Sequence, residues 1–148
     1  MLKAVILDDE PRGCKLLAHK LQYFEADISL VATFYDPEVA LIEINNHKPD
    51  VLFLDVEMPG MNGFQFLERL SGFAFEVIFT TAYDSYTLDA LRLSAVDYLL
   101  KPIADDELSQ AIVRLKSRVA QKTIAAPKPS GEFASKRLSL STAEGVYF

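Results

Sequence analysis

Five short apolar runs, separated by segments with helical spacing, constrain the fold of this chain more than any other feature of the sequence. Each run is continuous rather than alternating in polarity, which is typical of strands buried on both faces of a parallel sheet. Strands that alternate with helices require right-handed crossovers, and these place helices on both faces of the sheet. The pattern therefore predicts a doubly wound α/β fold with five parallel strands. The predicted strands are residues 4–7, 28–31, 51–54, 77–79 and 98–100.

The segments between the runs also carry signals for helix ends. Asp36 is a predicted N-cap, and Pro37 then occupies the first helical position. Two further helices are predicted to open at Asn62-Gly63 and at Asp84-Ser85. The last helix begins with acidic residues at 105–107 and carries basic residues at 116, 118 and 122 toward its end, which matches the helix dipole. Five strand–helix units are therefore expected within residues 1–122.

Length and composition narrow the class of protein. A chain of 148 residues, half of them hydrophobic, is large enough for one domain with a core and a short appendage. No apolar run approaches the length that a membrane span requires, and the N-terminus lacks the regions of a signal peptide. The single cysteine, Cys14, cannot form an internal disulfide. We expect a cytoplasmic protein without membrane association.

The net charge of −6 argues against direct binding to nucleic acid. Residues 1–122 are acidic overall, and residues 123–148 are only slightly basic. Binding to a phosphate backbone depends on clustered Lys and Arg, which these residues do not provide.

Reactive side chains follow four of the five predicted strands at their carboxyl ends. This is the edge at which doubly wound sheets bind their ligands. Carboxylates, hydroxyls and an ammonium group would meet there. The residues concerned are Asp8, Asp9 and Glu10 after the first strand, Asp55 after the third, Thr80 and Thr81 at the fourth, and Lys101 and Pro102 after the fifth.

Carboxylates that lie close together repel one another, so such a site requires a cation. Oxygen ligands without a nearby His or Cys predict Mg²⁺, for which Mn²⁺ could substitute. A carboxylate can also act as a nucleophile and form an acyl phosphate. Because catalysis of phosphoryl transfer depends on positioning and charge neutralisation, Lys101 and Thr81 are candidates for contacts to phosphoryl oxygens.

Taken together, these motifs resemble the receiver domain of two-component response regulators. The resemblance rests on the acidic pair Asp8-Asp9, on Asp55 within residues 54–63, on Thr81-Ala82 and on Lys101-Pro102. It covers about residues 2–122 of the chain. It implies a flavodoxin-like (βα)5 fold with the strand order 2-1-3-4-5.

The resemblance implies a role for each acidic residue of the site. Asp55 is the expected phosphoacceptor and also a ligand of Mg²⁺. Asp9 is expected to bind the metal directly, and Asp8 mostly through water. Glu57 is expected to contribute its backbone carbonyl as a further ligand.

The remaining motifs are expected to bind and to sense the phosphoryl group. The resemblance implies that Thr81 and Lys101 each contact a phosphoryl oxygen. The peptide bond between Lys101 and Pro102 is expected to be cis, which would direct the ammonium inward. Tyr98 is expected to act with Thr81 as a conformational switch.

Two segments, residues 79–84 and 95–103, resemble the receivers of LytTR-type (LytR/AlgR-like) regulators in particular. The expected organisation is a receiver domain at 1–122, a linker at 123–135 and the first strands of a truncated LytTR-type DNA-binding domain at 136–148. DNA contact is expected only through that missing output domain.

The same resemblance implies how the protein would work. A sensor histidine kinase would donate the phosphoryl group, and the phosphorylated receiver would form a homodimer through its fourth helix, fifth strand and fifth helix. The output domain would then regulate transcription. The chain is not expected to be a conventional enzyme beyond Mg²⁺-dependent self-phosphorylation and slow autodephosphorylation.

Two alternatives compete with this interpretation. A Mg²⁺-dependent phosphohydrolase of the haloacid-dehalogenase kind needs a second Asp two residues after its nucleophile, where this sequence has Glu57. A phosphorylation-independent binding module could have the same fold, although such proteins usually lack one of the acidic residues or the lysine. Cys14 and the acidic pair can also be read as core packing and as a solvated helix start.

Overall fold

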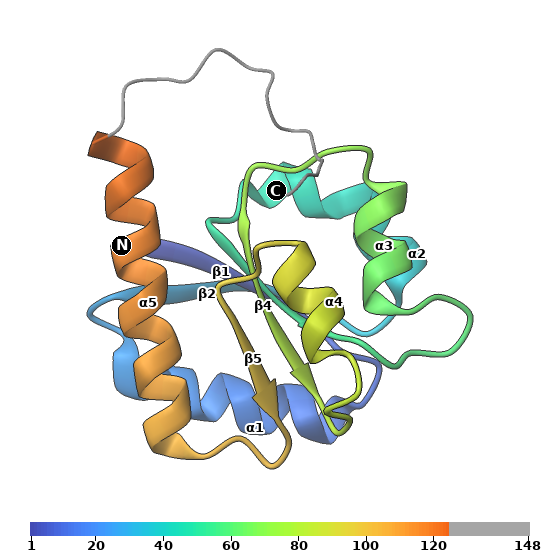
Figure 1. Ribbon diagram of the computed structural model, residues 1–148, viewed down its shortest axis with the longest axis horizontal. Coiled ribbons are helices and arrows are strands. Elements are labelled where there is room, and N and C mark those ends of the chain that lie inside the picture. The colour runs from blue at the N-terminus through green and yellow to red at the C-terminus, as the bar shows by residue number, and fades with distance from the viewer. Residues whose placement is uncertain (125–148) are drawn as a thin grey trace.

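The computed structural model describes residues 1–124 as a five-stranded, all-parallel sheet with helices on both faces (Figure 1). The strand order is β2-β1-β3-β4-β5. Fold class, strand number and strand order are therefore confirmed. The strands are β1 (Leu2–Leu7), β2 (Ile28–Phe34), β3 (Val51–Asp55), β4 (Glu76–Thr81) and β5 (Asp97–Leu100).

The helices form one layer on each face of the sheet. Helices α1 and α5 pack on one face, and α2, α3 and α4 pack on the other. The helices are α1 (Pro11–Leu21), α2 (Pro37–Glu43), α3 (Gly63–Arg69), α4 (Thr87–Arg92) and α5 (Asp105–Ile124), with 3-10 turns at Gln22–Phe24 and Ile44–His47. None of the described helices is long and apolar enough to cross a bilayer.

Burial on both faces explains why the strands are apolar without interruption. In β3, Val51 and Phe53 belong to the core beneath α1 and α5, whereas Leu52 and Leu54 belong to the core beneath α2, α3 and α4. All four side chains are fully buried. Alternate residues of one strand thus point into two separate cores, so no position in the run remains for a polar side chain.

Two of the predicted helix starts are confirmed by their capping contacts. The side chain of Asp36 accepts a hydrogen bond from the backbone N–H of Glu38 at 2.9 Å, and Pro37 is the first residue of α2. Asn62 caps α3 in a reciprocal arrangement with Gln65, in which each side chain accepts from the backbone N–H of the other.

The predicted start of α4 is wrong by two residues. The helix begins at Thr87, with Tyr86 at the N-cap position, rather than at Ser85 with Asp84 as its N-cap. The carbonyl of Asp84 accepts from the backbone N–H and the hydroxyl of Thr87, which makes a turn before the helix. Asp84 therefore contributes its backbone carbonyl to this turn.

Basic residues near the end of α5 contact distant parts of the chain. Arg118 and Lys122 each lie 3.2 Å from a carboxylate oxygen of the buried Glu76, at the start of β4. Arg118 also donates to the carbonyl of Ser94, between α4 and β5. These contacts fix the second half of α5 to the sheet. Residues 125–148, which hold most of the expected linker and the expected start of a second domain, lie outside the described residues.

Candidate functional site

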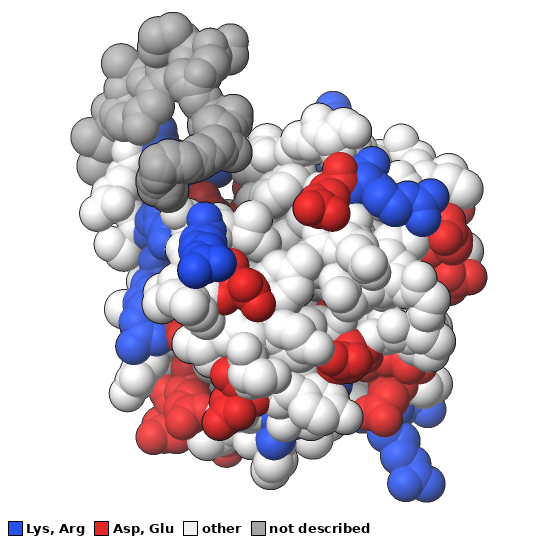
Figure 2. Space-filling model, turned by 45° about the vertical axis from the view of Figure 1, so that its right-hand side comes forward, with Lys and Arg blue, Asp and Glu red and all other residues white. Residues whose placement is uncertain are grey.

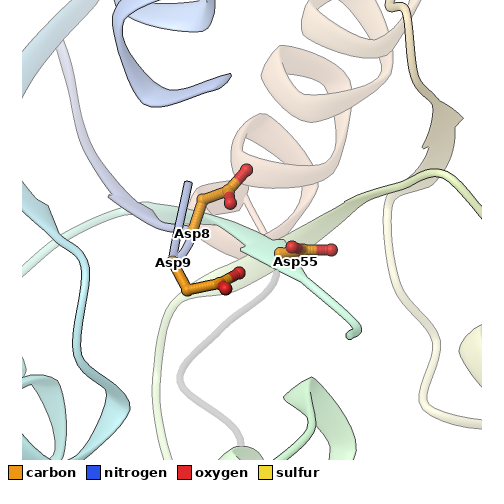
Figure 3. A group of neighbouring side chains, drawn as sticks. All are labelled: Asp8, Asp9 and Asp55. Atoms are coloured by element: carbon orange, nitrogen blue, oxygen red, sulfur yellow. The ribbon is translucent and has the colours of Figure 1, made fainter. Parts of the chain in front are cut away.

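The carboxyl ends of β1 and β3 bring three aspartates together (Figure 3). One carboxylate oxygen from each of Asp8, Asp9 and Asp55 lies within 4.8 Å of the others. Asp8 and Asp55 are buried, with exposed fractions of 3% and 5%, and Asp9 is half-buried. β1 and β3 are adjacent parallel strands in which Leu7 pairs with Leu54, so the residues that follow them emerge side by side.

Two glycines allow other elements to approach this cluster closely. A Cβ at Gly63 would lie only 2.7 Å from the carbonyl oxygen of Asp55, a distance that side chains do not tolerate. The N–H of Gly63 donates to the carbonyl of Val56 at 2.8 Å, which holds the start of α3 against the end of β3. A Cβ at Gly13 would lie 3.1 Å from a carboxylate oxygen of Asp8, so α1 also begins close to the site.

Lys101 enters the cluster from the end of β5. The Lys101–Pro102 peptide bond is cis, and the backbone N–H of Lys101 donates to the carbonyl of Thr81 at 2.8 Å. The ammonium nitrogen lies 2.6 Å from Oδ2 of Asp8 and 3.6 Å from Oδ2 of Asp55. The single cation among three carboxylates is thus nearer to Asp8 than to the expected phosphoacceptor.

Burial and crowding of like charge shift the ionisation of the aspartates. Burial raises the pKa of Asp55 to about 7, and the charges of Asp8 and Asp9 contribute to the rise, while Lys101 and the N–H of Glu57 oppose it. The pKa of Asp9 is also raised, by burial and by Asp8. Although burial lowers it, the hydrogen bond to Asp8 and the charge of Asp55 raise the pKa of Lys101 above its usual value. One ammonium therefore does not neutralise the cluster.

The chemistry of the donors fits a hard divalent cation. All three side chains of the cluster offer carboxylate oxygens, the ligands that Mg²⁺ prefers. Cys14 offers a soft donor beside the cluster, but it is buried and donates its thiol to the carbonyl of Asp8. Burial raises the pKa of Cys14 to about 12, so the thiol stays protonated and unsuited to metal binding.

Thr81 and Tyr98 both contact the backbone of Tyr83. The buried hydroxyl of Thr81 accepts from the N–H of Tyr83 at 3.3 Å, and the hydroxyl of Tyr98 donates to the carbonyl of Tyr83. The ring of Tyr98 packs against Phe79 of β4. Both residues that were predicted to act as a switch therefore form hydrogen bonds with the loop between β4 and α4.

Glu57 has a side-chain contact that sequence reasoning missed. The sequence nominated this residue for its carbonyl alone, but the hydroxyl of Tyr86 donates to the Glu57 carboxylate. The two residues lie 29 positions apart, on different loops, and neither belongs to a pattern that would pair them. Only the packing of α4 beside the loop after β3 brings them into contact.

The family model for the response regulator receiver domain matches residues 4–113, most of the chain. The chain belongs to the response regulator receiver family. Among solved structures, this receiver domain is similar to the receiver domain of AraT, a response regulator from Geobacillus stearothermophilus. The two are 33% identical, with a TM-score of 0.71, and the match covers 82% of this chain and 98% of the other.

The names of two curated relatives describe regulation and sensory transduction. The positive alginate biosynthesis regulatory protein of Pseudomonas aeruginosa is 33% identical over 98% of this chain and 60% of its own length. The sensory transduction protein LytT of Bacillus subtilis is 31% identical over 99% of this chain and 60% of its own. These relatives confirm the resemblance to LytTR-type regulators. The chain spans less than two thirds of the length of either relative.

Proposed function

We propose that this receiver domain accepts a phosphoryl group on Asp55 from a sensor histidine kinase and controls a C-terminal DNA-binding domain. The observation that carries the proposal is the meeting of Asp8, Asp9, Asp55 and Lys101 at one edge of the sheet. These groups supply a nucleophile, a set of metal ligands and a cation within a few ångströms. Family membership supports the same chemistry.

Mg²⁺, or Mn²⁺ in its place, would be held by the carboxylates of Asp8, Asp9 and Asp55 and by the backbone carbonyl of Glu57. When bound, the metal supplies positive charge that offsets the repulsion among the carboxylates and the phosphoryl oxygens. Burial, with a further contribution from the neighbouring carboxylates, raises the pKa values of Asp9 and Asp55, and a bound cation would favour their ionised forms.

The chemical step depends on Asp55 as nucleophile. A carboxylate oxygen attacks the phosphorus of a phosphohistidine, the new O–P bond forms as the P–N bond breaks, and the imidazole nitrogen keeps the electron pair. Lys101, 3.6 Å from Asp55, would then pair with a phosphoryl oxygen, and the hydroxyl of Thr81 would donate to another. Slow hydrolysis of the acyl phosphate would return the domain to its starting state.

The conformational change caused by phosphorylation would be transmitted to the surface through Thr81 and Tyr98. Both residues hold the backbone of Tyr83, so a shift of Thr81 toward a phosphoryl oxygen alters the support of the loop before α4. The elements of the proposed homodimer interface, α4, β5 and α5, each carry exposed apolar side chains. These are Leu88 and Leu91 of α4, Leu100 of β5 and Val113 of α5.

The rest of the regulator would lie beyond the described residues. The expected linker at 123–135 starts too early, because α5 extends to Ile124. We infer that a linker follows α5 as far as residue 135 and that residues 136–148 begin a LytTR-type output domain, which supplies the DNA contact. The two LytTR-type relatives support this division, because their matches cover nearly the whole chain. On the face shown in Figure 2, Lys and Arg are interspersed with Asp and Glu, which suits a domain that does not itself bind DNA. A cytoplasmic location follows from the proposed kinase and DNA partners.

The test is the mass of the intact protein after incubation with acetyl phosphate or phosphoramidate, with Mg²⁺ or with a chelator. The wild type should gain one phosphoryl group only in the presence of Mg²⁺. Asp55→Asn should gain none, while Asp106→Asn, at the exposed start of α5, should behave as the wild type. Equal incorporation by Asp55→Asn would refute the assignment. No incorporation by any protein would favour a phosphorylation-independent binding module.

A further inference from the structure

The carboxylate of Glu57 is held by a residue that the proposed chemistry does not use. Glu57 lies two residues after Asp55, and its backbone N–H donates to Oδ1 of Asp55 at 3.3 Å. Its exposed side chain accepts a hydrogen bond from the hydroxyl of Tyr86, the N-cap residue of α4. The Glu57 carboxylate, two residues after the phosphoacceptor in the sequence, is thus restrained by one side-chain contact.

Tyr86 is the fixed member of this pair. Its ring lies 5.8 Å from that of Phe64, which in turn packs against the fully buried Phe79 at 4.9 Å. Glu57, by contrast, has no other side-chain hydrogen bond or ion pair among the described residues. The hydrogen bond to Glu57 is the main cause that raises the pKa of the Tyr86 hydroxyl. The tyrosine therefore determines where the carboxylate lies.

The position of the tyrosine decides the direction in which the carboxylate points. Tyr86 packs on the core beneath α3 and α4, whereas Asp8 and Lys101 approach Asp55 from the ends of β1 and β5. The hydrogen bond therefore holds the Glu57 carboxylate beside the start of α4. A released Glu57 side chain is free to turn about a backbone that is bonded to Asp55.

We propose that Tyr86 is a positioning residue for phosphorylation, which holds the carboxylate of Glu57 away from the path of an anionic phosphodonor. This inference rests on the proposed function of Asp55. The site already combines three carboxylates with one ammonium, so a further mobile carboxylate beside Asp55 repels a phosphate-bearing donor. Because solvent screens an exposed charge, the effect is moderate and depends on salt.

The experiment compares wild type, Tyr86→Phe, Glu57→Gln and the double variant. The initial rate of phosphoryl gain is followed by intact mass with subsaturating acetyl phosphate and saturating Mg²⁺. Tyr86→Phe should be slower than wild type by about two- to tenfold at low ionic strength, the size expected of one partly screened charge. Glu57→Gln has no charge to release, so Tyr86→Phe should have no effect in that background. Raising the salt to about 0.5 M should bring Tyr86→Phe close to wild type.

Tyr35→Phe is the matched control. This tyrosine is 47% exposed, follows β2 and loses the same hydroxyl, so its rate should equal that of wild type. A slowing by Tyr86→Phe of less than about twofold, an equal slowing in the Glu57→Gln background, or no change with salt would each overturn the proposal. If wild type itself gains no phosphoryl group, the proposed function fails. If wild type is phosphorylated and Tyr86→Phe matches it, only the role of Tyr86 fails.

Discussion

Asp55→Asn is expected to stabilise the fold when no divalent cation is present. The substitution replaces a buried carboxylate with a neutral amide of similar shape. Burial and the neighbouring aspartates raise the pKa of Asp55 to about 7 from an ordinary value of 3.8. The folded chain therefore binds this proton more tightly than the unfolded chain does. Ionising Asp55 opposes folding above about pH 4, and its cost increases until about pH 7.

The size of the pKa shift of Asp55 sets an upper limit on the stability that Asp55→Asn gains. One pKa unit corresponds to about 1.4 kcal/mol, so a rise of this size costs at most about 4 kcal/mol at pH 8. The site can relax and admit water, which reduces the cost of a buried charge, and we expect a net gain of about 1–3 kcal/mol for the variant. At pH 5 the gain in stability should fall to less than half, because pH 5 is only about one unit above the pKa of Asp55 in the unfolded chain.

The free energy of unfolding can be measured by urea titration followed by circular dichroism, in chelator at pH 8 and pH 5, and again in Mg²⁺. Saturating Mg²⁺ should stabilise the wild type more than Asp55→Asn, and so reduce or reverse the difference at pH 8. Glu25→Gln, at an exposed position, should change stability by no more than a few tenths of a kcal/mol. If Asp55→Asn is less stable than wild type at pH 8 in chelator, the attraction of Lys101 outweighs burial and the reasoning is wrong.

Two further substitutions test the packing and the charge of the site. Gly63→Ala should lower the free energy of unfolding by about 2 kcal/mol or more and slow phosphorylation, because its Cβ would lie 2.7 Å from the carbonyl of Asp55. Thermal unfolding and intact mass report the two effects, and a fully stable Gly63→Ala would contradict the close approach of α3. Lys101→Ala should bind Mg²⁺ more tightly in a calorimetric titration, because the ammonium that competes with Mg²⁺ for Asp8 and Asp55 is gone. The variant should also accept a phosphoryl group more slowly, because the same ammonium would no longer pair with a phosphoryl oxygen. Weaker Mg²⁺ binding by Lys101→Ala would show that the lysine organises the ligands.

Local sequence was sufficient for the elements whose signals are carried by neighbouring residues. The caps at Asp36 and Asn62 depend on contacts two or three residues away, so the start of each helix was predictable. Prediction was less accurate where the signal weakened. β2 extends to Phe34, three residues beyond the predicted end, because it is an edge strand and its middle residues are only partly buried. The start of α4 was wrong because Asp84 makes its turn through a backbone carbonyl.

The sequence by itself determined that this protein is a doubly wound sheet with acidic, hydroxyl and lysine residues at the ends of its strands. That much depends on periodicity and on the order of residues along the chain. The tertiary structure alone decided which groups meet. Lys101 lies closer to Asp8, 93 residues away, than to Asp55, and Tyr86 binds Glu57. Differences of one ångström between possible partners depend on how helices and strands pack, and no local pattern in the sequence encodes them.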